Sequence, residues 1–164
     1  MKKLLSITLV IFMGLAGVTF GQSANDAIKA LKKLEAKTET GINYKDFATA
    51  LADTKVEVES FVNSKQAKKK PGLAECLNKT LGHYMLTNKI MNERNFNRRM
   101  ARESGNKYAE LDSDVIKTDS PMGKMLMRQY PRIKPDKGMY FVEIVVPEIW
   151  KEASNELKKC DSSM

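Results

Sequence analysis

The sequence predicts an all-α fold, a four-helix bundle-like single domain with an irregular connection before the last helix. Three observations predict it. Four segments carry apolar residues at the 3.6-residue spacing of an amphipathic helix. Proline and glycine stand at the boundaries between these segments. Residues 22–164 have a length that suits one domain with its own core, and no internal repeat divides them.

The first two predicted helices span about residues 23–40 and 43–64. Gly41 follows the first helix, where a helix end favours a residue that tolerates positive φ. Asn43 is the predicted N-cap of the second helix. The apolar stripes are Ala24, Ala27, Leu31, Leu34 and Thr38 in the first helix, and Tyr44, Phe47, Ala48, Leu51, Val58, Phe61 and Val62 in the second. Each helix is therefore expected to bury one face.

The third predicted helix spans about residues 72–102 and follows a basic linker, residues 65–72. Pro71 suits the first turn of that helix, because proline has no N–H to leave unpaired there. Its core stripe is Leu73, Leu77, Leu81, Tyr84 and Met91. Residues 106–138 show little periodicity and contain prolines, so we expect an irregular connection with at most one short helix at about 122–130.

The last predicted helix spans about residues 140–159. We expect a kink near Pro147, since proline removes a backbone donor and crowds the preceding turn. Its apolar face is Val142, Val146, Ile149, Ala153, Leu157 and Cys160. Residues 139–146 also fit a buried strand, and the pattern leaves that choice open. We prefer the helix because such a strand would have no partner elsewhere in the chain.

Residues 1–21 have the three parts of a secretory signal peptide. Lys2 and Lys3 precede an apolar run, residues 4–16, and small residues lead to a predicted cleavage site after Gly21. The apolar run is shorter than the about 20 residues that a membrane-crossing helix needs, and no other stretch approaches that length. The sequence therefore predicts export by a bacterial Sec-type signal to the periplasm or cell exterior, with no transmembrane span.

One segment of the first two predicted helices resembles known sequences. Residues 27–59 read A-I-K-A-L-K-K-L-E-A-K-T-E-T-G-I-N-Y-K-D-F-A-T-A-L-A-D-T-K-V-E-V-E. This segment is similar to one found in small exported helical proteins of bacteria whose function is uncharacterised. The resemblance implies an exported helical protein. It implies no activity, and it transfers no functional residues.

The chain has two cysteines and one histidine. Cys76 and His83 are seven positions apart on the third predicted helix, about 10 Å along its axis, which is too far for one metal ion to bridge easily. Cys160 is the preferred disulfide partner of Cys76, because exported proteins mature in oxidising compartments. Two free or intermolecular thiols are the alternative. His83 is expected to be a hydrogen-bonded structural side chain.

A candidate metal site lies in the irregular connection. Met122, Met125 and Met127 are closely spaced, and their thioethers are soft ligands that suit Cu(I). The alternative is hydrophobic packing under a loop, because methionine also fills irregular gaps in cores.

Two basic clusters form a candidate surface for an anionic membrane or glycan. They are Lys68, Lys69 and Lys70 in the linker, and Arg94, Arg98 and Arg102 on one side of the third predicted helix. Phe96 and Met100 lie near the arginines in the sequence and strengthen the comparison with a membrane-binding helix. The alternative is a solvated charged surface.

Composition and motifs favour a binding role over catalysis. The net charge of +8 favours polyanionic neighbours. We find no Ser–His–Asp arrangement, no Gly-rich phosphate loop and no histidine cluster, so we predict no catalytic residues and no cofactor. Export makes a nucleic-acid partner unexpected.

The predicted function is therefore binding, as an interaction or scaffolding component of the cell envelope. The expected partner is an envelope protein or an anionic envelope polymer. The alternative is a periplasmic protein that binds a small ligand or Cu(I). The sequence leaves the oligomeric state open.

Overall fold

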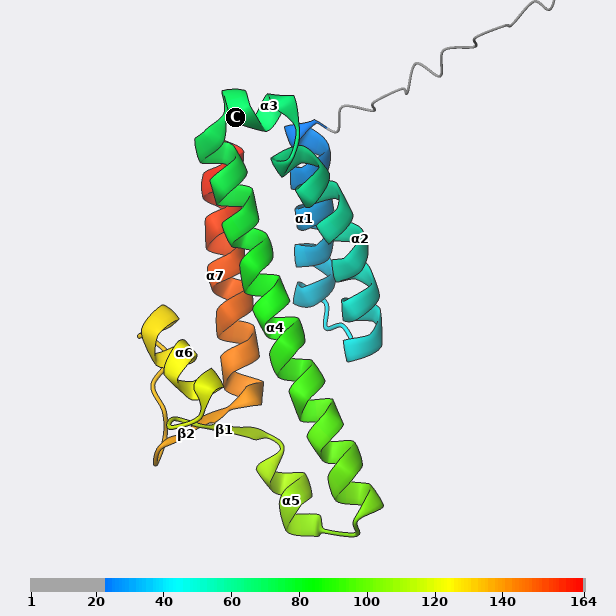
Figure 1. The fold of residues 1–164 in the computed structure, drawn as a ribbon, viewed down its shortest axis with the longest axis vertical. Coiled ribbons are helices and arrows are strands. Elements are labelled where there is room, and N and C mark those ends of the chain that lie inside the picture. The colour runs from blue at the N-terminus through cyan, green and yellow to red at the C-terminus, as the bar shows by residue number, and fades with distance from the viewer. Residues whose placement is uncertain (1–22, 164) are drawn as a thin grey trace, which may run out of the picture.

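The chain is described here from a computed structural model that covers residues 23–163 (Figure 1). The predicted signal peptide, residues 1–21, lies outside the described residues. The helices are α1 (Ala24–Glu39), α2 (Tyr44–Val62), α3 (Lys65–Lys69), α4 (Pro71–Glu103), α5 (Lys107–Asp112), α6 (Pro121–Gln129) and α7 (Val142–Ser162), and the strands are β1 (Val115–Lys117) and β2 (Met139–Phe141). The described chain is mostly helical, as predicted.

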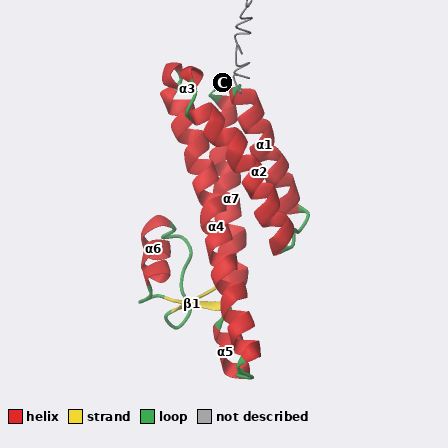
Figure 2. Ribbon diagram, turned by 45° about the vertical axis from the view of Figure 1, so that its right-hand side comes forward, coloured by secondary structure: helices red, strands yellow, loops and turns green. Residues whose placement is uncertain are grey.

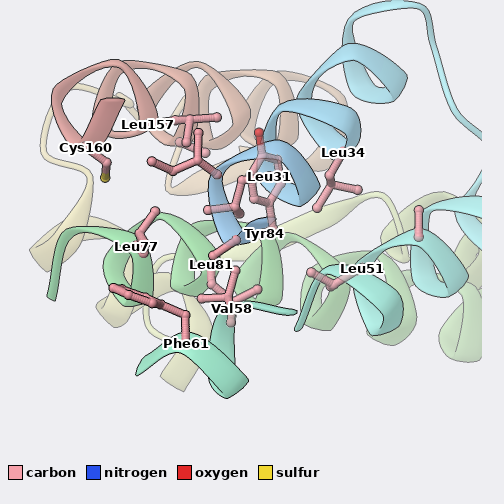
Figure 3. Close-up of a cluster of buried hydrophobic side chains, with 14 of the residues drawn as sticks. Leu31, Leu34, Leu51, Val58, Phe61, Leu77, Leu81, Tyr84, Leu157 and Cys160 are labelled. Atoms are coloured by element: carbon pink, nitrogen blue, oxygen red, sulfur yellow. The ribbon is translucent and has the colours of Figure 1, made fainter. Parts of the chain in front are cut away.

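Four long helices, α1, α2, α4 and α7, lie side by side around a main core (Figures 1 and 2). Figure 3 shows Leu31, Leu77 and Leu157, which come from three different helices, in this one cluster. The other large members are Ile28, Leu34, Phe47, Leu51, Val58, Phe61, Leu73, Leu81 and Tyr84. The apolar stripes predicted for the first three helices thus supply most of the main core, and each fully buried side chain of this size stabilises the fold by about 1.5–3 kcal/mol.

Side chains cap the first turns of α1 and α2, and of these caps the sequence predicted the one on α2. Ser23 and Asp26 form a capping box at the start of α1. The side chain of Asn43 accepts a hydrogen bond from the backbone N–H of Asp46 and caps α2, as predicted. Gly41 separates the two helices with a φ of 80°. The predicted linker at residues 65–72 is partly helical, because Ser64 caps the short helix α3.

The last helix begins at Val142, slightly later than the predicted start at about residue 140. Residues 139–141 form the strand β2, which pairs antiparallel with β1, so that Ile116 lies opposite Tyr140. Our expectation that a strand here would lack a partner was therefore wrong. β1 is only three residues long, too short to show an alternating pattern in the sequence. α7 then begins at Val142 and continues through Pro147, which removes one intrahelical hydrogen bond; the kink predicted there stays a prediction.

A second core lies where the strands and α6 pack on α7 and on the middle of α4. Its buried members are Ile90, Met122, Leu126, Tyr130, Ile133, Tyr140, Val142, Val145, Val146 and Ile149. α6 approaches the chain that leaves β1 so closely that a Cβ on Gly123 would overlap the carbonyl oxygen of Lys117 and lie 2.7 Å from the Cα of Thr118. Gly123 is therefore required for this packing. The irregular connection is accordingly more ordered than predicted.

The rest of α4, together with α5 and the turn after it, forms a distal arm, residues 92–114. α4 continues past the main core, and α5 lies alongside its end (Figure 1). In the part of α4 beyond Ile90, Ala101 is the one fully buried side chain, and α5 has none. The arm therefore has almost no apolar core of its own. In residues 23–163 no helix combines the length and the apolar character needed to cross a bilayer.

Candidate functional site

The predicted cysteine pair joins two helices at the end of the molecule opposite the distal arm. Cys76 near the start of α4 and Cys160 near the end of α7 form a disulfide, with their Cα atoms 5.6 Å apart. Cys160 is fully buried in the main core. Among the described residues no cysteine is free. The cysteines therefore serve the fold, and the structure separates Cys76 from His83.

His83 makes the structural hydrogen bond expected of it. Its Nδ1 lies 2.6 Å from the hydroxyl oxygen of Tyr130, at the end of α6. Burial lowers the pKa of His83, and nearby Lys79 adds to that effect. Burial, with a contribution from Glu152, raises the pKa of Tyr130 to about 12. Both groups are thus neutral near pH 7, and the hydrogen bond between them, whose donor depends on the His83 tautomer, ties the second core to α4.

The surface beside His83 holds charges of which most are paired with one another. A pocket of about 230 Å³ is lined by His83, Tyr130 and charged residues of both signs. Glu156 accepts from Lys79 at 3.1 Å and from Lys159 at 3.2 Å. Within residues 23–163 no group of three or more His, Cys, Asp or Glu side chains is placed to hold a metal ion. This pocket therefore offers few uncommitted groups to a ligand.

The arginines of the predicted basic surface bind acids of the distal arm. Arg94 and Arg98 each hydrogen-bond to one carboxylate oxygen of Asp114. Arg102 binds Glu110 of α5 at 2.7 Å. Partial burial would raise the pKa of Asp114, but hydrogen bonds from Arg98 and Arg94 outweigh it and lower that pKa. These arginines hold α5 and the turn after it against α4, and much of their charge is neutralised within the arm.

The predicted lysine cluster lies at the other end of the molecule. Lys68 and Lys69 are exposed in the last turn of α3, and Lys70 follows as its C-cap. Figure 1 shows α3 and the distal arm at opposite ends of the long axis. The structure therefore does not bring the two basic clusters together.

The three methionines of the candidate metal site do not share one side of α6. Met122 is buried in the second core, Met125 is half-buried against it, and Met127 is 46% exposed. Positions 122 and 127 are about 140° apart around a helix axis. Met122 and Met125 line one cavity, which Met127 does not reach. The structure thus brings two of the three thioethers together.

That cavity, here called the side cavity, lies between α4 and the unit formed by β1 and α6. Its volume is about 410 Å³, within the range of small-molecule pockets. Its apolar lining is Ile90, Pro121, Met122, Met125, Val115, Ile116 and Val142, and its polar lining is Lys89, Glu93, Arg94, Asn97, Ser113, Lys117 and Ser120. Sequence reasoning missed Lys89 and Lys117 as neighbours, because only the pairing of β1 with β2 brings them to one cavity.

The distal arm exposes four large apolar side chains. On α4, Phe96 is 53% and Met100 is 49% exposed, and on α5, Tyr108 is 82% and Leu111 is 70% exposed. The guanidinium of Arg99 lies 5.6 Å from the ring centre of Phe96. Sequence reasoning had singled out Phe96 and Met100 but not the two residues of α5, which lie in a stretch without periodicity.

Comparison with known proteins does not place the chain in a family, because no family model, no curated protein and no solved structure matches it. The resemblance of residues 27–59 to exported bacterial proteins stays a prediction.

Proposed function

We propose that this chain is a four-helix bundle-like protein, exported to the bacterial periplasm or cell exterior, that acts by binding as an interaction or scaffolding component of the envelope. The distal arm makes the contact with the partner. One observation carries the proposal: four large apolar side chains are exposed on an arm that has almost no core of its own. Single exposed apolar residues are normal, whereas several on one thin element are typical of an interaction surface.

The arrangement of these side chains fits a contact with a protein. Phe96 and Met100 lie one turn apart on the side of α4 opposite to Arg94, which faces Asp114. Tyr108 and Leu111 share one side of α5 in the same way. The arginines therefore hold the arm together from within while apolar groups point outward. Aromatic anchors are enriched at protein interfaces, whereas an anionic polymer would be bound through charge.

Export is supported by two features of the chain. The first residues have the pattern of a signal peptide, and the two cysteines pair, as expected in an oxidising compartment. Exposed Lys68 and Lys69, far from the arm, add a second surface that favours anionic neighbours.

A pull-down from envelope extract tests the proposal. The full chain should recover one stoichiometric partner, and the double variant Phe96→Ser with Met100→Ser should lose it. Val56→Ser is the matched control, because Val56 is 61% exposed on α2, outside the arm. Circular dichroism checks that all variants remain helical. Equal recovery by the double variant, or recovery of lipid or glycan alone, would contradict the proposal.

A second candidate function is the binding of a small ligand, and the side cavity favours it. In its Cu(I) form the ligands would be Met122 and Met125, since both line the cavity while Met127 does not. A Cu(I) titration should then weaken with Met125→Leu and stay unchanged with Met127→Leu. Absence of Cu(I) binding would remove the metal form.

A further inference from the structure

We infer that the side cavity binds a small amphipathic anion, in its simplest form a medium-chain carboxylate. The tail would lie on Ile116, Met122 and Met125, and the acid group would lie at Lys89 and Lys117. This inference rests on the second candidate function, ligand binding in the side cavity, and names the chemical class of that ligand.

Buried side chains of the second core support the apolar wall of the cavity. Ile90, Met122 and Val142 are 2%, 8% and 3% exposed and belong to the second core. Ile116 and Met125 are half-buried against the same core. A tail that covers the half-buried Ile116 and Met125 removes their remaining apolar surface from water, and the buried side chains behind them keep them ordered, which favours binding.

The charged part of the cavity favours an anion. Lys89, Arg94 and Lys117 carry positive charge, and Glu93 is the one acid among the lining residues. Arg94 is engaged with Asp114. Within residues 23–163, neither Lys89 nor Lys117 forms an ion pair. Two uncommitted ammonium groups from different elements, α4 and β1, therefore border one apolar surface.

The size of the cavity sets the length of the ligand. A volume of about 410 Å³ holds about a dozen water-sized groups, at about 30 Å³ each. Octanoate fits within that space. A long-chain acid or a folded peptide would extend beyond it.

Isothermal titration of the purified full chain with octanoate tests the inference, with octan-1-ol and octylammonium as neutral and cationic probes of equal length. Octanoate should bind most tightly of the three. Lys89→Gln and Lys117→Gln should each weaken octanoate binding about two- to fivefold, the range of an exposed ion pair. Lys124→Gln is the matched control, because Lys124 is exposed on α6 and does not line the cavity.

A second pair of variants locates the tail. Met125→Gln should weaken octanoate binding, while Met127→Gln should not, because Met125 lines the side cavity and Met127 does not.

Three results would overturn the inference, and they differ in what they imply. Equal binding of octan-1-ol and octanoate, unaffected by the lysine variants, would keep ligand binding and reject recognition of the anion. Unchanged binding by Met125→Gln would place the ligand elsewhere. No binding of any probe would reject the inference, while the Cu(I) titration tests the other form of the ligand-binding function separately.

Discussion

The main core and the distal arm use one helix, α4, in two different ways. Near its start, α4 turns Leu77, Leu81 and Tyr84 into the main core. In the arm, the same helix instead carries Arg94 and Arg98, which bind Asp114. α4 is thus one continuous helix that begins inside an apolar core and ends in a partly exposed ionic contact.

The main core and the distal arm differ in how strongly their contacts stabilise the fold. A fully buried side chain of the main core contributes about 1.5–3 kcal/mol, and the disulfide, whose cysteines are 84 positions apart in the sequence, adds roughly 4.5 kcal/mol in the loop-entropy model. Ion pairs that are partly exposed contribute about 0–1 kcal/mol each. The arm is therefore expected to open locally while the main core stays folded, which suits a segment that fits itself to a partner.

The largest expected effect comes from the same truncation made in both regions. Phe61→Ala removes a fully buried ring from the main core and should lower the free energy of unfolding by about 3–5 kcal/mol. Phe96→Ala removes a 53% exposed ring from the arm and should change it by less than about 0.5 kcal/mol. Urea denaturation measures both. Similar losses would mean that the arm carries a core after all.

A smaller, local effect is expected from Asp114→Asn. The change leaves Arg94 and Arg98 without their carboxylate, and we expect it to free α5 from α4 at a cost of about 1–2 kcal/mol. Limited proteolysis within residues 104–120 should accelerate, while the thermal midpoint of the main core hardly moves. A lower thermal midpoint with unchanged proteolysis would contradict this division.

The same contact has a defined pH dependence. Because the pKa of Asp114 is lowered below its ordinary value of 3.8, the folded state keeps this carboxylate charged at pH values where the unfolded chain takes up a proton. The stabilisation is complete above the unfolded pKa and is lost as pH falls through the lowered one. Proteolysis of the arm should therefore accelerate at acid pH in the parent chain, and less so in Asp114→Asn.

The smallest effect on the free energy of unfolding is expected from His83, which joins α4 to Tyr130 of the second core. Burial lowers the pKa of His83 below 6.5, so the unfolded chain binds a proton before the folded one does. The free energy of unfolding should be highest above about pH 6.5 and decrease as pH falls toward the lowered pKa. Nuclear magnetic resonance follows this one histidine directly. The free energy of unfolding should decrease less between about pH 7.5 and about pH 5.5 in His83→Gln than in the parent chain. An equal decrease in both would mean that other groups cause the pH dependence.

The sequence predicts the long elements well and the short ones poorly. α1, α2 and most of α4 follow from repeated apolar positions and from caps such as Asn43. β1 and β2 do not, because three residues are too few to display an alternating pattern, and their pairing is a tertiary contact. The prediction at residues 139–141 was therefore wrong because the partner strand was not recognised, and not because the periodicity was misread.

The candidate site shows the same limit. Linear spacing grouped Met122, Met125 and Met127, yet a helix turns the last of them away from the cavity. Spacing also placed Arg94 and Arg98 on one side of a helix correctly. It did not reveal that Asp114 covers them, because that contact depends on how the chain returns after α5.

Native-state hydrogen exchange along α4 tests the contrast between the two regions most directly. We predict that amides of residues 77–90 exchange only through global unfolding, since their side chains reach the main and second cores. Amides of residues 96–103 and of α5 should exchange much faster, through local opening of the arm. Uniform protection from residue 77 to residue 103 would contradict the account.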